Sequence, residues 1–102
     1  MIIVLGHVVV RDEHVEQALA LSLEHVRRSR LEPGCLEHGV SRDAEAGNRL
    51  VFVEKWASME ALRAHFRVSE SRRFVESLAA WSSGPPTMQI FEATETSPRA
   101  SG

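Results

Sequence analysis

A tryptophan and a histidine lie on either side of one strand-to-helix junction in the segment VFVEKWASMEALRAHF, residues 51–66. A neutral imidazole at His65 can accept a proton at cellular pH. Trp56 and Phe52 offer flat apolar surfaces against which an aromatic ring can bind while water is excluded. Glu54 is a candidate to orient the imidazole or to hold a hydroxyl of the ligand. The segment therefore indicates a site where a proton moves beside a bound aromatic ring.

The same residues also have a purely structural interpretation. Trp56 can be a core residue between sheet and helix, His65 can lie on the helix surface, and Glu54 can pair with an arginine of a second subunit. Phe74 and Trp81 belong to a later helical segment and are expected in the core.

The other histidines divide into two groups. His7 and His38 lie within predicted strands, so each is either a hydrogen-bonded core residue or a further pocket group. His14 and His25 fall outside the apolar stripe of the first predicted helix and are expected to be solvated. A metal site of His7, His38, His65 and Glu54 has only spacing in its favour, so no metal is expected.

The hydrophobic pattern changes its period several times along the chain. Residues 2–10 form an almost unbroken β-branched run, which predicts a strand covered on both faces. Asp12 is expected to cap a helix that Pro33 and Gly34 end. The rest of the pattern predicts strands over 35–43 and 49–57 joined as a hairpin, a helix over 59–67 capped by Ser58, a break near Val68, a helical segment over 71–83 and a last strand over 87–93.

This order of elements, β-α-β-β-α-β, predicts an α+β ferredoxin-like fold: a four-stranded antiparallel sheet with helices on one face. Residues 1–94 form one domain, and residues 95–102 are expected to be a flexible tail. On the third strand, the small Val51 and Val53 are expected to pack on the helices, which turns Phe52, Glu54 and Trp56 toward a cavity. The strands carry apolar residues at odd and at even positions, so both faces of the sheet are apolar. The face without helices is therefore expected to be covered, most simply by a second copy of the chain.

Composition narrows the class of protein. With 102 residues, 25% charged residues and a net charge of −2, the chain is expected to be one globular domain, too short to bury a large cavity without a second subunit. The acidic balance and the lack of tyrosine disfavour nucleic-acid binding. No apolar run could cross a bilayer, and the N-terminal MIIVLG does not look like a signal peptide, so a cytoplasmic location is expected. The single cysteine, Cys35, is expected to be a small buried residue.

Three stretches, EPGCLEHGVSRD, NRLVFVEKWASMEALRAHF and GPPTMQIFEA, resemble the antibiotic biosynthesis monooxygenase family in order and spacing. The resemblance covers roughly residues 2–92. It implies a homodimeric α+β barrel that oxidises a quinol or polyketide-type phenol with dioxygen and without flavin, haem or metal. It places the cavity tryptophan of the family on Trp56 and its frequent helix histidine on His65. With Glu54 these are the predicted catalytic residues, and the predicted substrate-binding residues are Phe52, His7, His38 and Leu62.

Several positions depart from the pattern of the family. Phe52 and Leu62 stand where polyketide-oxidising members carry an asparagine and a tyrosine. A non-catalytic dimeric barrel that binds a small aromatic metabolite is therefore the alternative function. Val75 stands where haem-degrading members carry a histidine, which disfavours haem degradation.

Overall fold

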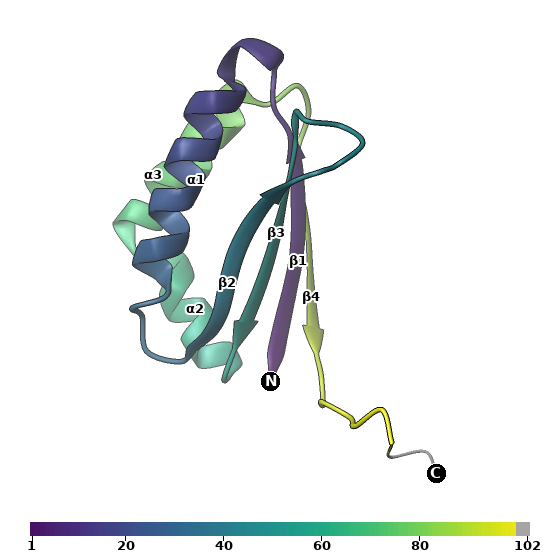
Figure 1. Cartoon of the computed structure of the whole chain (residues 1–102). Coiled ribbons are helices and arrows are strands. Elements are labelled where there is room, and N and C mark those ends of the chain that lie inside the picture. Colours follow the sequence, from purple (N-terminus) through teal and green to yellow (C-terminus); the bar gives the residue numbers. More distant parts are fainter. Residues whose placement is uncertain (100–102) are drawn as a thin grey trace.

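The computed structural model describes residues 1–99 and confirms the predicted α+β ferredoxin-like fold (Figure 1). Its elements are β1 (Ile2–Val9), the short 3-10 helix η1 (Asp12–His14), α1 (Val15–Ser29), β2 (Cys35–Arg42), β3 (Arg49–Trp56), α2 (Met59–Arg67), α3 (Ser69–Trp81) and β4 (Thr87–Glu92). Residues 95–99 of the predicted tail form no helix or strand, and 100–102 lie outside the described residues.

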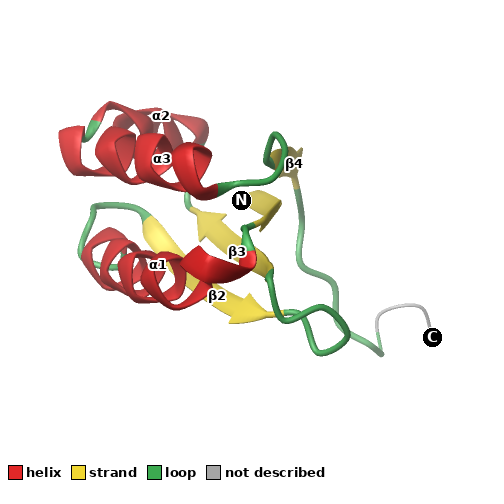
Figure 2. Cartoon of the chain, turned by 90° about the horizontal axis from the view of Figure 1, so that it is seen from above, coloured by secondary structure: helices red, strands yellow, loops and turns green. Residues whose placement is uncertain are grey.

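The four strands form one antiparallel sheet in the order β2-β3-β1-β4. All helices lie on the same face of this sheet, with α1 and α3 packed against each other (Figures 1 and 2). Within the described residues, no helix has the length and apolar character needed to cross a membrane.

Local signals set most of the helix boundaries. Ser58 caps α2, because its Oγ accepts the backbone N–H of Ala61 at 3.2 Å. Val68 is extended and separates α2 from α3, as predicted. The predicted cap at Asp12 is wrong: this residue lies inside η1, a turn closed by backbone hydrogen bonds, and α1 begins only at Val15.

The turn between α1 and β2 packs directly on α2. Gly34 has a φ of +82°, which favours glycine. A Cβ added there would lie 2.6 Å from Cβ of Ala61, so only a glycine lets the turn approach this closely. The turn therefore carries the residues before Gly34 against the helix that holds His65.

The core fills the layer between sheet and helices in two apolar clusters. One contains Val8, Val10, Val15, Ala18, Leu50, Phe52, Phe74 and Leu78, and the other contains Ile2, Val4, Trp56 and Leu62. Phe52, Glu54 and Trp56 thus face the helices, and the prediction that Val51 and Val53 pack on the helices is wrong. Trp56 packs with Leu62, and Phe52 packs with Phe74. These large side chains of β3, and not Val51 and Val53, therefore contribute to the core.

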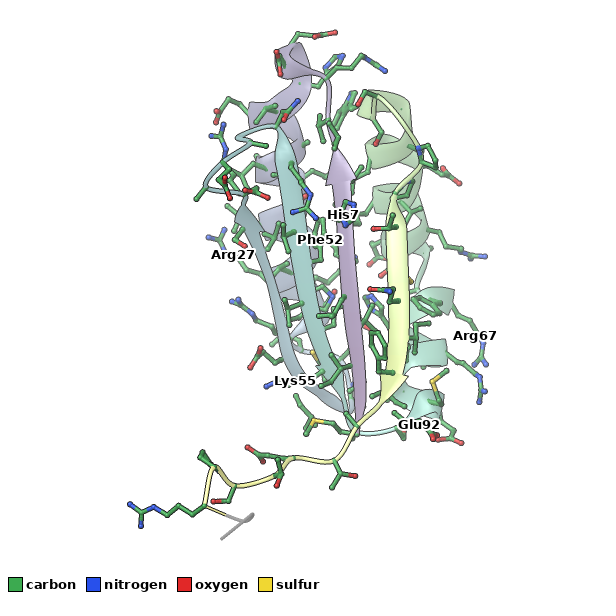
Figure 3. All side chains as sticks on the ribbon, turned by 90° about the vertical axis from the view of Figure 1, so that its right-hand side faces the viewer. His7, Arg27, Phe52, Lys55, Arg67 and Glu92 are labelled. Carbon is green, nitrogen blue, oxygen red and sulfur yellow. The ribbon has the colours of Figure 1, made fainter. Side chains whose placement is uncertain are left out.

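The opposite face of the sheet is open in the single chain (Figure 3). Leu5 and Val9 of β1 are 41% and 37% exposed, and Phe91 of β4 is 44% exposed. The sequence predicts that β1 is covered on both faces, but the single chain covers only the face toward the helices.

Candidate active site

One protomer carries a cavity of about 390 Å³ between the sheet and the helices. Its wall is mostly apolar, and Val75 of α3 and Met88 of β4 mark its outer side, since both are exposed. Every residue of β4 is exposed, because the helices do not pack down on this edge strand. The cavity of the single chain is therefore open along this edge.

His65 lines the cavity and is oriented by a carboxylate behind it. Its Nδ1 lies 2.9 Å from Oε1 of Glu32, and its ring lies 4.7 Å from that of Trp56. An ionised carboxylate can only accept, so Nδ1 carries the hydrogen and Nε2 of the neutral ring holds a lone pair. His65 is only 4% exposed, which excludes the helix-surface interpretation. The pair Glu32–His65 has the arrangement of an oriented general base.

Glu32 was not identified from the sequence, where it belongs only to the Glu-Pro-Gly stretch that ends the first helix. Its partner lies 33 positions away along the chain. The available signal is the glycine two residues later: Gly34 packs on Ala61, and His65 follows Ala61 by one helical turn. A carboxylate so close to a tightly docked turn is placed to reach that helix face.

Glu54 also faces the cavity, with its partners behind it. Its Oε1 accepts the Nε1–H of Trp56 at 2.9 Å and lies 3.3 Å from Nε2 of His38. Burial alone would raise the pKa of Glu54, but these contacts with His38 and Trp56, together with nearby His65, hold the pKa below its usual value. Glu54 is therefore an ionised acceptor inside an apolar layer.

Trp56 and His38 support the cavity from behind. Neither lines it, and both are almost completely buried. The 3.3 Å contact of His38 with Glu54 lacks hydrogen-bond geometry, so both ring nitrogens are without a hydrogen-bond partner among the described residues. Trp56 thus agrees with the core interpretation while holding Glu54 and His65 in place.

His25 is buried, so the prediction that it is solvated is wrong. It lies one helical turn after Ser22, a member of the predicted stripe, so the buried face of α1 is wider than the sequence pattern indicated. The ring stacks on Phe74 at 4.0 Å, and Nδ1 lies 2.8 Å from Nη2 of Arg28. Burial, with His38, His65 and Arg28 nearby, lowers the pKa of His25 to about 3, so its imidazole is neutral at physiological pH.

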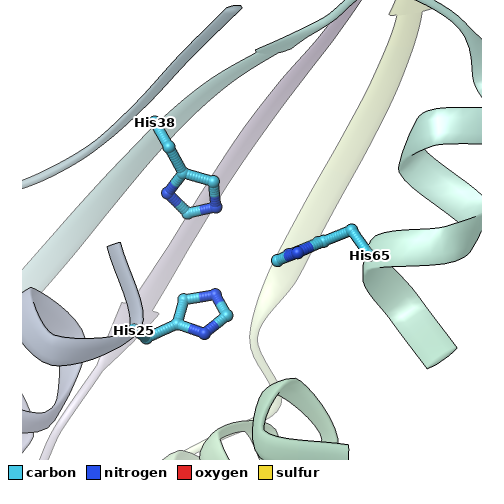
Figure 4. A group of neighbouring side chains, drawn as sticks. All are labelled: His25, His38 and His65. Carbon is cyan, nitrogen blue, oxygen red and sulfur yellow. The ribbon is translucent and has the colours of Figure 1, made fainter. Parts of the chain in front are cut away.

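The rings of His25, His38 and His65 point toward one common space (Figure 4). Their centroids are 5.2 to 5.5 Å apart, and one nitrogen of each lies within 4.8 Å of the others, which a metal ion could bridge. However, Arg28 donates to Nδ1 of His25, which leaves the hydrogen on Nε2, and its guanidinium charge repels a cation. The cluster therefore suits hydrogen bonding to an organic ligand better than metal binding.

A known protein family shares this arrangement of elements. The sequence profile described as antibiotic biosynthesis monooxygenase matches residues 1–77, which is most of the chain. The chain belongs to the antibiotic biosynthesis monooxygenase family. The uncharacterized protein sll1783 of Synechocystis sp. is 32% identical over 95 residues, which cover 93% of this chain and 65% of that protein. The chain thus spans just under two thirds of this relative.

Solved structures agree with the family assignment. A crystal structure of an antibiotic biosynthesis monooxygenase is 26% identical with a TM-score of 0.87, and the match covers 93% of this chain and 100% of the other. Rv0793 from Mycobacterium tuberculosis shares the fold at 19% identity, with a TM-score of 0.86 and coverage of 93% and 96%. Membership in the family supports a monooxygenase-type function.

The remaining predicted residues of this family member occupy different positions. Phe52 lines the cavity next to Glu54. His7 reaches only the rim, because on β1 it shares the open face with Leu5 and Val9, and there its Nδ1 lies 2.7 Å from Oγ1 of Thr87 on β4. Leu62 is completely buried in the cluster with Trp56 and does not reach the cavity. The cavity therefore presents Phe52, Glu54 and His65 from the predicted set and adds His25.

Proposed function

We propose that this chain is a cofactor-independent monooxygenase that oxidises a quinol or polyketide-type phenol with dioxygen inside this cavity. The observation that carries the proposal is the Glu32–His65 pair, a buried imidazole with a fixed tautomer at an apolar cavity. Membership in the family supports the same class of reaction. The substrate is an electron-rich ring that becomes reactive once it loses a hydroxyl proton.

With a reduced naphthoquinone as substrate, Nε2 of His65 takes a hydroxyl proton. The resulting naphthoquinol anion gives one electron to dioxygen. The semiquinone and superoxide combine through a new C–O bond, and the protonated His65 returns its proton to the peroxide. The O–O bond then breaks with loss of the ring C–H proton as part of water. One hydroquinone and one dioxygen thus give one hydroxyquinone and one water.

The other cavity residues hold the reacting ring. Phe52 and Phe74 supply flat apolar walls, which bind the ring and exclude water from the radical pair. Glu54 is ionised and accepts a hydrogen bond from a second hydroxyl of the ring. A substrate with two hydroxyls therefore uses both polar groups.

The proposed assembly is a homodimer formed through the open face of the sheet. Leu5, Val9 and Phe91 expose apolar surface there, and the half-buried Val51 and Val53 lie on the neighbouring strand β3. Contiguous apolar surface of this kind in a globular protein is usually covered by a partner. A second copy would bury it by presenting the same face.

The test is oxygen uptake by metal-stripped protein supplied with a reduced naphthoquinone, corrected for autoxidation and measured with a chelator present. Wild-type protein is compared with His65→Ala. The matched control is His14→Ala, because His14 stacks on Trp81 and does not line the cavity. We expect His65→Ala to lose at least tenfold in rate, about 1.4 kcal/mol of barrier, and the control to keep it.

Two results would contradict the proposal. Equal rates for His65→Ala and wild type would remove His65 as the base. No uptake above the autoxidation blank, together with saturable binding of the quinone, would instead identify a non-catalytic barrel that binds an aromatic metabolite.

A further inference from the structure

We propose that His25 is a further catalytic residue whose Nε2–H donates a hydrogen bond to the anionic oxygen that forms in the cavity during oxygenation. The proposal rests on the proposed function, because it concerns the same cavity and the same reaction. It assigns to His25 the role of a neutral donor, opposite to the role of His65 as a proton acceptor.

The hydrogen bonds of the two rings fix opposite tautomers. Arg28 has only N–H donors, so Nδ1 of His25, 2.8 Å from its Nη2, must accept. The neutral His25 ring therefore carries its hydrogen on Nε2. In His65 the partner of Nδ1 is the carboxylate of Glu32, so the hydrogen is on Nδ1 and the lone pair on Nε2. One ring is a donor and the other an acceptor.

Both rings reach the same ligand space. His25 and His65 line the cavity, and their centroids are 5.3 Å apart. Figure 4 shows them directed toward one region between α1 and α2. A substrate oxygen that loses its proton to His65 therefore develops its charge within reach of His25.

The position of the His25 ring is set by two contacts with α3. The ring stacks on Phe74 with an interplanar angle of 9°. Arg28, which holds Nδ1, also donates to Oγ of Ser71 at 3.2 Å. A donor held in advance where negative charge develops stabilises a transition state without reorganisation, and such donors make large contributions to catalysis.

The charge state of His25 agrees with a donor that does not titrate. Four groups face the ring: Arg28 from its own helix, His38 from β2, Glu54 from β3 and His65 from α2. Burial and the three cationic or potentially cationic groups outweigh the carboxylate, so the pKa falls to about 3. The donor is thus present over the whole physiological range.

A role in packing alone would not need this arrangement. A phenylalanine could stack on Phe74 equally well, and Arg28 would then have no partner at this position. A metal ligand would need the lone pair on Nε2, which the bond from Arg28 removes. Only a donor uses both the stacking and the guanidinium.

The first test measures tautomers and does not depend on turnover. Long-range proton–nitrogen correlation spectra of protein with isotope-labelled histidine distinguish Nδ1–H from Nε2–H rings. We expect His25 to be neutral with Nε2–H and His65 to have Nδ1–H at neutral pH. Adding the anion of hydroxynaphthoquinone, the expected product, should shift the His25 Nε2–H signal. A His25 ring with Nδ1–H, or binding of the anion without this shift, would overturn the proposal, as would no binding.

The second test uses variants of the donor. His25→Gln keeps an N–H donor, whereas His25→Leu removes it. We expect His25→Leu to bind the hydroxynaphthoquinone anion at least tenfold more weakly and to change kcat by a larger factor than KM. We expect His25→Gln to recover most of the affinity and most of kcat. Equal binding by wild type and His25→Leu would overturn the proposal even if the protein proves to have no oxygenase activity.

The third test covers the case in which His25→Leu does not fold. Arg28→Met removes the group that fixes the tautomer, and Arg27→Met is its matched control because Arg27 is exposed on the same helix. We expect the Nε2–H fraction of His25 and the affinity for the anion to fall in Arg28→Met only. Unchanged values in Arg28→Met would contradict the role given to this arginine and to the tautomer.

Discussion

Each face of the sheet departs in part from the usual distribution of polar and apolar groups. The face toward the helices is buried, yet it carries His38 and Glu54 and receives His25 and His65 from the helices. The open face carries exposed apolar residues of β1 and β4. Polar groups are usually found outside and large apolar groups inside.

Buried polar groups and exposed apolar groups are both unfavourable in free energy, and each indicates what kind of partner would bind there. A buried polar group is unfavourable unless it is hydrogen-bonded, and both nitrogens of His38 lack such a partner among the described residues. Exposed apolar surface is unfavourable unless something covers it. The polar groups that line the cavity, Glu54 and His65, suit a polar ligand on the helix side, and the exposed apolar residues suit a second protein chain on the open side.

The largest expected effect concerns the open face. Leu5→Lys places a charge in the middle of the proposed dimer interface, and we expect the dimer dissociation constant to rise at least a hundredfold, roughly 2.7 kcal/mol. Sedimentation at several concentrations measures it. Leu31→Lys is the matched control, since Leu31 is 87% exposed and lies in the turn after α1. A monomeric wild type, or a dimeric Leu5→Lys variant, would contradict the interface.

The second effect concerns the turn that connects the two sides of the site. Gly34→Ala forces a Cβ to within 2.6 Å of Ala61 at a positive φ, so we expect a loss of about 2 kcal/mol of unfolding free energy, measured by denaturant unfolding. Gly39→Ala is the control, because an added Cβ there meets nothing within 4 Å. Equal stability of the two variants would show that the turn is not tightly packed on α2.

The third effect isolates the carboxylate behind His65. Glu32→Gln keeps the shape of the side chain but replaces the charge that favours the productive tautomer, so we expect kcat to fall about tenfold, near 1.4 kcal/mol, with stability little changed. Glu24→Gln, an exposed change on α1, is the control. A Glu32→Gln variant with the kcat of wild type would restrict Glu32 to a structural role.

The smallest effect is the pH dependence of stability due to His25. Its pKa is about 3 in the folded chain against 6.5 without shift, so the unfolded chain binds more protons as the pH falls. The contribution of His25 to the free energy of unfolding is therefore fully present above pH 6.5 and is lost as the pH falls toward 3. About 1 kcal/mol is lost between pH 8 and 6. His25→Phe should show a shallower acid loss in the same unfolding series. An identical slope would mean that His25 is not buried in its neutral form.

The sequence was sufficient for the elements of the fold and for part of the site. The change from period two to period 3.6, together with Ser58, Val68 and Gly34, places most strands and helices within a few residues. The same local pattern placed His65 and Glu54 on neighbouring elements, and both line the cavity.

Three features could not be predicted because they depend on distant parts of the chain. Alternation on β3 separates Phe52 and Glu54 from Val51 and Val53, but it does not tell which set faces the helices. The pairing of Glu32 with His65 depends on how one turn docks on α2. The burial of His25 depends on α3, which is distant along the sequence and supplies Phe74.

The most direct test of the central claim is to follow the oxygen atoms. Metal-stripped wild type and His65→Ala are given a reduced naphthoquinone under isotopically labelled dioxygen, and the masses of the quinone products are compared with the autoxidation blank. We expect hydroxyquinone with one labelled oxygen from the wild type, one dioxygen consumed per product, and at least a tenfold lower rate from His65→Ala. Unlabelled product, or labelled product formed equally fast by His65→Ala, would contradict oxygenation by His65 in this cavity.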